Sequence, residues 1–197
     1  MASQVEILNR AIVLLGEKRI AAPSDDTKAA RELSAVWDTS RKGLLRSHAW
    51  GFAMKRAALA PLSTSPAFGF TNQFLLPSDF LRLYRIADFF VGLPTQSLYI
   101  GGEEPYAIES SASGTVLMCD LGNPLNIVYV SDVTVTTAFD ALFVPALAAQ
   151  LAVDTAATLA GSDAAYARAE RALMRALARV AREADGRTFR LIGVGAA

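Results

Sequence analysis

Histidine and cysteine are almost absent from this sequence of 197 residues, which contains one histidine, His48, and one cysteine, Cys119. A lone cysteine excludes a disulfide and a cysteine-based zinc site within this sequence, and a lone histidine excludes a cluster of histidine ligands. Cys119 ends the apolar run Val116–Cys119, which favours a buried thiol over a nucleophile. His48 follows a basic stretch at the end of a predicted helix, which favours a helix cap over a catalytic base.

Motifs that carry catalysis or hold a cofactor are absent as well. The sequence contains no G-x-S-x-G, G-x-G-x-x-G or P-loop pattern. One alternative is a hydrolase of cell-wall glycan, in which Glu103 or Glu104 acts together with Asp120. Adjacent acids in a G-G-E-E-P turn are more typical of a solvated loop tip. We therefore predict that the protein is not an enzyme and has no catalytic residue, cofactor or metal.

The sequence also lacks an excess of either charge. Lys+Arg and Asp+Glu both number 19, which does not support general affinity for nucleic acid or a membrane surface. The longest run of apolar character, Phe139–Ala160, is interrupted by Asp140, Gln150 and Asp154, so we read it as a buried helix rather than a membrane span. The first residues lack a basic region followed by an apolar run, so we expect no signal peptide.

Four helices are predicted from apolar periodicity and cap residues, over Gln4–Leu15, Asp26–Ser47, Phe139–Ala160 and Ala164–Asp185. Ser3 and Glu6 form a capping box at the start of the first helix, and Gly16 can end it in the left-handed conformation. Pro145 is tolerated only in the first turn, which favours a start of the third helix nearer Phe143.

Short runs rich in aromatic and β-branched residues occupy the middle of the chain, at Phe70–Leu76, Leu81–Ile86, Leu98–Gly101, Ala107–Ser110, Thr115–Cys119 and Asn126–Val130. Trp50, Phe52 and Met54 also alternate with smaller or polar residues, as in a strand. We predict an α+β protein in which an antiparallel β sandwich or small barrel is inserted into a helical bundle. The predicted division is residues 1–60 and 132–186 for the bundle, 61–131 for the β region and 187–197 for an extended tail. The predicted core anchors are Trp37, Trp50, Phe52 and Phe74.

The most unusual charged feature is a stripe of arginines at helical spacing in the fourth helix: Arg168, Arg171, Arg175, Arg179 and Arg182. By the 3.6-residue period we expect it opposite an apolar face made of Tyr166, Leu173, Leu177, Val180 and Ala184. The stripe is either a solvated face or a surface that meets acidic groups of a partner or nucleic acid. A helical DNA-binding protein that uses Arg168–Arg182 is therefore a second alternative.

The C-terminal residues are too apolar for a free solvated tail. We expect this tail either to fold back onto the β region or to add a strand to a partner. Together with the arginine stripe, the predicted partner interface includes Arg187, Phe189, Arg190, Leu191 and Ile192.

The order of these parts resembles the tail tubular protein A, or head-to-tail adaptor, family of short-tailed bacteriophages. The resemblance covers nearly the whole chain and is carried by short motifs: Ala11-Ile-Val-Leu-Leu-Gly16, the Ala-rich helix with Ala29-Ala30-Arg31, Trp50-Gly51-Phe52-Ala53, the segment Phe74–Arg82, Ile127-Val-Tyr-Val130, and Phe139–Phe143 before the paired C-terminal helices.

This resemblance implies a structural virion protein of the tail connector. Twelve copies would form a ring that joins the phage portal protein to the tail nozzle and contacts tail fibre proteins. The ring would continue the DNA channel without sequence-specific binding and without contact with a membrane. The helical part would face the portal and neighbouring subunits, and the β part would carry the tail contacts.

Overall fold

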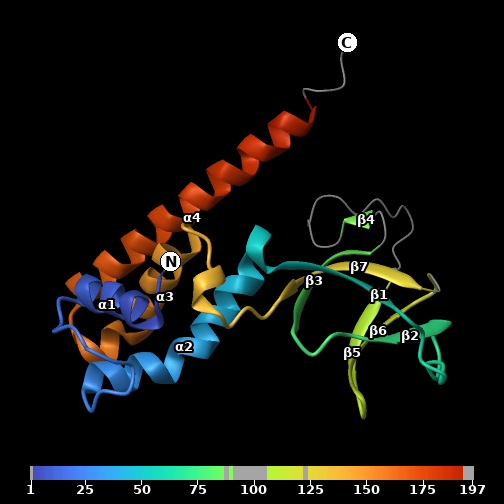
Figure 1. Ribbon diagram of the computed structural model, residues 1–197, viewed down its shortest axis with the longest axis horizontal. Helices are drawn as coiled ribbons and strands as arrows, with labels where there is room; N and C mark the ends of the chain where they lie inside the picture. Colours follow the sequence, from blue (N-terminus) through green and yellow to red (C-terminus); the bar gives the residue numbers. More distant parts are fainter. Residues whose placement is uncertain (1, 87–88, 91–105, 122–123, 193–197) are drawn as a thin grey trace. The chain divides into compact units, whose positions relative to one another are not determined.

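The computed structural model describes residues 2–86, 89–90, 106–121 and 124–192, with the backbone alone for residues 89–90 and 183–192. The chain forms two compact units (Figure 1). The helical unit comprises Met1–Ser47 and Thr134–Ala197, and the β unit comprises His48–Val133. Helices and antiparallel strands thus occupy separate parts of the chain, which confirms the predicted α+β class.

The helical unit is built around one central helix, α3 (Phe143–Leu159), which packs against α1 (Gln4–Leu15), α2 (Lys28–Ser47) and α4 (Asp163–Ile192). Ten of the 17 residues of α3 are buried, as expected for a central helix, while Gln150 and Asp154 are hydrogen-bonded to each other on its more exposed side. It begins at Phe143, so Pro145 falls in its first turn, where a missing N–H breaks no helical hydrogen bond.

Local signals set the ends of α1 as predicted. The Glu6 N–H donates to Ser3 Oγ at 3.3 Å, and the Ser3 N–H donates to Glu6 Oε2 at 2.7 Å, which completes the capping box. Gly16 ends the helix with φ of 81°, a conformation that a residue with a Cβ adopts only under strain.

Alanines dominate the buried face of α4, which packs against α3 and α1. The described core of α4 consists of Ala165, Ala169, Ala176 and Val180. The apolar face predicted for this helix is therefore wrong in part, because Tyr166 is 46% exposed and the alanines beside it are buried instead. Small side chains let two helix backbones approach closely, so the alanine face fits against the alanine-rich α3 better than a face of large residues.

The β unit contains two antiparallel sheets. One sheet has the order β1-β7-β3-β4, and the other has the order β2-β6-β5. The strands are β1 (Met54–Leu59), β2 (Asn72–Leu75), β3 (Phe80–Ile86), β4 (Phe89–Phe90), β5 (Ala107–Ser111), β6 (Gly114–Cys119) and β7 (Leu125–Ser131). Side chains from both sheets, among them Phe74 of β2 and Ile127 of β7, belong to one buried cluster. The sandwich-or-barrel layout remains a prediction.

Two sequence-based expectations are wrong, and a third concerns residues that the structure does not describe. Trp50, Phe52 and Met54 do not form a strand, because Gly51–Ala53 is a 3₁₀ turn closed by the Ala53 N–H on the Trp50 carbonyl at 2.9 Å, and β1 begins only at Met54. The first boundary between the units consequently lies after Ser47 rather than near residue 60. The predicted strand Leu98–Gly101 lies outside the described residues.

The extended tail predicted for residues 187–197 is wrong for residues 187–192, which continue α4. Gly186 costs a helix interior only about 1 kcal/mol relative to alanine, which a long run of good helix formers before it offsets. Residues 193–197 lie outside the described part of the chain. Among the described residues, no helix combines the length and the apolar character needed to cross a lipid bilayer.

A basic groove as the candidate functional site

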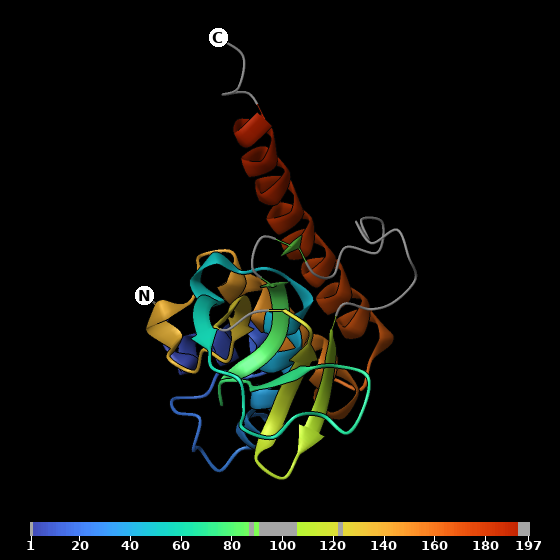
Figure 2. The same ribbon diagram turned by 90° about the vertical axis from the view of Figure 1, so that its right-hand side faces the viewer.

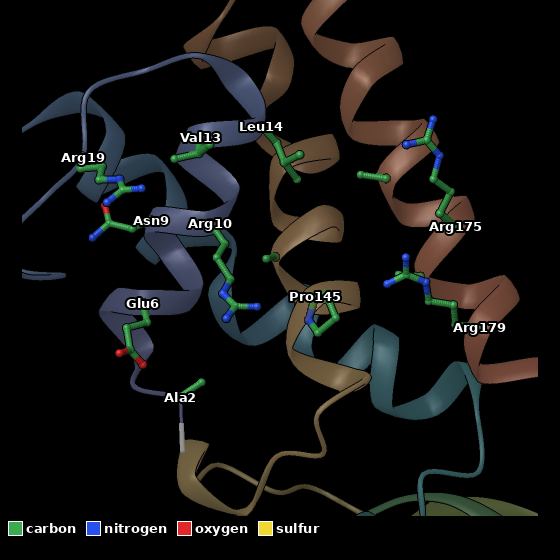
Figure 3. Close-up of a pocket in the computed structure, with 13 residues that line it drawn as sticks. Ala2, Glu6, Asn9, Arg10, Val13, Leu14, Arg19, Pro145, Arg175 and Arg179 are labelled. Atoms are coloured by element: carbon green, nitrogen blue, oxygen red, sulfur yellow. The ribbon is translucent and has the colours of Figure 1, made fainter. Parts of the chain in front are cut away.

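An open groove of about 820 Å³ lies within the helical unit (Figure 3). Helix α1 forms one wall, the middle of α4 forms the other, and Pro145 and Ala148 of α3 contribute from between them. Four arginines line it: Arg10 from α1, Arg19 from the link after α1, and Arg175 and Arg179 from α4. The groove therefore gathers positive charge from three separate segments of the chain.

The guanidinium groups in the groove have no partner in the described part of the chain. No hydrogen bond or ion pair to Arg10, Arg19, Arg175 or Arg179 is formed among those residues. Figure 3 shows Arg179 extending from α4 toward α1, Arg175 one turn away on the same helix, and Arg10 extending from α1 toward the space beside Pro145. Like charges that line one groove repel one another unless an anion or water screens them.

One acidic side chain, Glu6, also lines the groove, but its carboxylate is engaged elsewhere. It accepts the backbone N–H of Ser3, and this hydrogen bond lowers the pKa of Glu6, with the nearby charge of Arg10 acting in the same direction. Figure 3 shows the Glu6 side chain at the end of α1, where it caps the helix. The groove therefore contains four arginines and one carboxylate that already accepts a hydrogen bond, so it is strongly cationic.

The side chain of Asn9 joins α1, which forms one wall of the groove, to the link that carries Arg19. Its Nδ2 donates to the Ile20 carbonyl and its Oδ1 accepts the Ile20 N–H, both at 2.9 Å. The side-chain amide thereby pairs with a backbone amide as a neighbouring strand would. Ile20 is buried, so the link is held by packing as well as by hydrogen bonds.

The five arginines of the predicted stripe fall into three groups in the structure. Arg168 Nη1 donates to the Leu14 carbonyl at 3.0 Å, which satisfies the C-terminal end of α1 and is a structural role. Arg175 and Arg179 line the groove. Arg171 and Arg182 are exposed and lie outside it, and Arg182 Nε donates to the Ala178 carbonyl of its own helix at 3.1 Å.

The remaining interface candidates belong to the last turns of α4. The backbone of Arg187, Phe189, Arg190, Leu191 and Ile192 is helical, and their side chains lie outside the description. Of the predicted core anchors, Trp37, Trp50 and Phe74 are buried, and Phe52 is half-buried.

Sequence reasoning missed Arg10 and Arg19. Neither residue belongs to a charged run or to a periodic stripe, and only the packing of α1 beside α4 brings them to Arg175 and Arg179. No local pattern in the sequence could have identified them.

The residues of the hydrolase alternative do not form a described site. Glu103 and Glu104 lie outside the described residues. Asp120 accepts the Thr71 N–H at 2.7 Å and Thr71 Oγ1 at 2.8 Å, and these hydrogen bonds lower the pKa of Asp120, so it serves the loop before β2. Within the described ranges, no group of three or more His, Cys, Asp or Glu side chains could hold a metal ion.

The surroundings of His48 disfavour a charged helix cap. Burial lowers the pKa of His48, and the positive charge of Arg82 lowers it further, so the neutral imidazole is favoured. Its ring instead packs near Trp50, with a centroid separation of 5.6 Å. Cys119 is buried, and burial raises the pKa of its thiol, which opposes a nucleophilic role as the sequence predicted.

Neither the comparison with protein-family models nor the comparison with curated proteins finds a match to this chain. The resemblance to the head-to-tail adaptors therefore rests on the short motifs quoted above.

Proposed function

We propose that the protein is a structural head-to-tail adaptor of a short-tailed bacteriophage. In this role it forms a ring, with twelve copies as the expected number, between the portal protein and the tail nozzle of the virion. The order of motifs along the chain supports the proposal. So does the architecture, in which both chain ends build one helical unit and the β unit is inserted between them.

The observation that carries the proposal is the length of α4 compared with its neighbours. With a rise of 1.5 Å per residue, the 30 residues of α4 span about 45 Å. The 17 residues of α3 and the 12 residues of α1 span about 26 Å and 18 Å. Figures 1 and 2 both show α4 continuing past the ends of α1 and α3. The last described residue of α4 that is buried is Val180.

Helix α4 continues for 12 residues past Val180, the last of its residues that is described as buried. Tertiary packing supplies most of the stability of helices in proteins, so a projecting helix is expected to gain it from another chain. In a ring, each subunit offers one surface to the next and receives a different one, and the ring closes only when the rotation between them fits. The end of α4 is suited to such a contact or to a contact with the portal.

The test is electron microscopy of the purified protein mixed with the portal protein encoded in the same genome. We expect a ring of additional density at the narrow end of the portal. A variant that lacks residues 183–197 should remain folded by circular dichroism, because the described core of α4 ends at Val180, but should bind the portal more weakly.

A matched control keeps α4 at full length and changes its charge instead. Glu170→Gln alters an exposed position of α4 that is not among the predicted interface residues, so the ring should still form. Absence of a ring when both proteins are folded would contradict the adaptor role. Full portal binding by the truncated variant would contradict the part assigned to the end of α4.

A further inference from the structure

The groove of the helical unit is lined by arginines and by apolar residues, and we refer to the apolar part as its floor and to the arginines as its rim. The floor comprises Val13, which is 49% exposed, and Leu14 from α1, with Pro145 and Ala148 from α3. The arginines line the same groove. We propose that the groove is a docking site for an acidic segment of a partner protein, with apolar side chains on the floor and carboxylates paired to the arginines. This inference follows from the groove alone and does not depend on the adaptor role.

The charge and the spacing of Arg175 and Arg179 both match a pair of carboxylates. A planar guanidinium pairs with a carboxylate through two parallel N–H donors, which is the strongest form of such a contact. Arg175 and Arg179 lie four residues apart on one helix, so they are separated by about 6 Å along its axis. Carboxylates at positions i and i+4 of a helix, or i and i+2 of a strand, have nearly the same separation.

The lining favours a protein segment over nucleic acid. Sites that hold single-stranded nucleic acid stack bases on aromatic side chains, and no aromatic residue lines this groove in the described part of the chain. Duplex binding is dominated by phosphate contacts and does not need an apolar floor. An amphipathic acidic segment uses both the floor and the rim, as in helix-in-groove recognition.

The experiment uses the full-length protein and a synthetic peptide as the probe. The peptide is an amphipathic helix with glutamates four residues apart and leucines between them, labelled for fluorescence anisotropy. Two control probes are the same peptide with glutamine at every glutamate position and inorganic polyphosphate. A single-stranded oligonucleotide of matched charge tests the nucleic-acid alternative.

Two double variants isolate the groove from the overall charge of α4. Arg175→Gln with Arg179→Gln removes two charges from the groove, and Arg171→Gln with Arg182→Gln removes two charges from the same helix outside it. All four residues are exposed, so both variants should fold. We expect the groove variant to bind the acidic peptide at least about tenfold more weakly, and the control variant to bind within about twofold of the original protein.

The apolar floor provides an independent test. Val13→Ser should weaken peptide binding about threefold, since about half of a valine side chain is available for burial, and should leave polyphosphate binding unchanged. Equal losses in the two arginine variants, or tighter binding of the oligonucleotide or polyphosphate than of the peptide, would overturn the proposal. So would failure of the acidic peptide to bind better than its glutamine version. Each of these outcomes is separate from ring formation on the portal, so the two proposals can fail independently.

Discussion

Asn9 provides a direct test of how the groove is held together. Asn9→Ala removes both hydrogen bonds between this side chain and the backbone of Ile20, each 2.9 Å long. These bonds fix the link that carries Arg19 against α1. The truncation also leaves the N–H and C=O of a buried residue without their partner, because Ile20 is 6% exposed.

The expected magnitude follows from counting the bonds. A neutral hydrogen bond in a folded protein contributes about 1 kcal/mol net. Asn9→Ala should therefore lower the free energy of unfolding of the helical unit by about 2 kcal/mol. Asn9→Asp keeps an acceptor for the Ile20 N–H but turns a carboxylate oxygen toward the Ile20 carbonyl, where the two acceptors repel each other, so it should cost at least as much as Asn9→Ala.

The two tryptophans allow the helical unit to be followed separately, because Trp37 belongs to α2 and Trp50 belongs to the β unit. In a Trp50→Phe background, the fluorescence of Trp37 during urea unfolding reports the helical unit. The slope of the free energy with urea should be the same for all variants, since the surface exposed on unfolding is unchanged.

Two results would refute this reasoning. One is a loss below about 0.5 kcal/mol for Asn9→Ala, which is the size expected for an ordinary surface substitution. The other is a clearly smaller loss for Asn9→Asp than for Asn9→Ala, which would mean that the donor to the Ile20 carbonyl makes no contribution.

Three further predictions concern packing and titration. Ala169→Leu should destabilise the helical unit by about 1 to 3 kcal/mol in the same urea assay, because Ala169 is fully buried. The control Ala178→Leu, at an exposed position, should change stability by less than about 0.5 kcal/mol. Similar costs at both sites would contradict the alanine contact with α3. Burial and the hydrogen bond to Asp79 raise the pKa of Tyr129 to about 12, so its contribution to stability is complete below the unfolded pKa near 10 and is lost as pH rises toward 12. Tyr129→Phe should remove this loss from unfolding curves measured across that range, and an unchanged pH dependence would assign it to other groups. Cys119 is buried with a raised pKa, so a thiol reagent should modify it only when the β unit unfolds, and rapid labelling of the native protein would contradict its burial.

Local chemistry explains which parts of the fold could be predicted from the sequence. The first helix begins and ends where its cap residues predict, because a capping box and a left-handed glycine act within a few residues. The predicted strands at Leu81–Ile86, Ala107–Ser110, Thr115–Cys119 and Asn126–Val130 lie within the observed strands. Helix α4 continues beyond its predicted end at Asp185, because the β-type residues and the glycine that follow this position do not interrupt the helix.

The sequence by itself determined the α+β class, the ends of α1, the position of Pro145 in the first turn of α3, and the presence of an arginine stripe on the last helix. Each depends on spacing along the chain, which can be read without the fold. Only the tertiary structure decided that alanines rather than larger residues form the buried face of α4. It also decided that Arg175 and Arg179 line one groove together with Arg10 and Arg19, while Arg168 donates to the C-terminal end of α1. Helical periodicity defines the faces of a helix, but the neighbour that each face meets depends on packing between segments far apart in the chain.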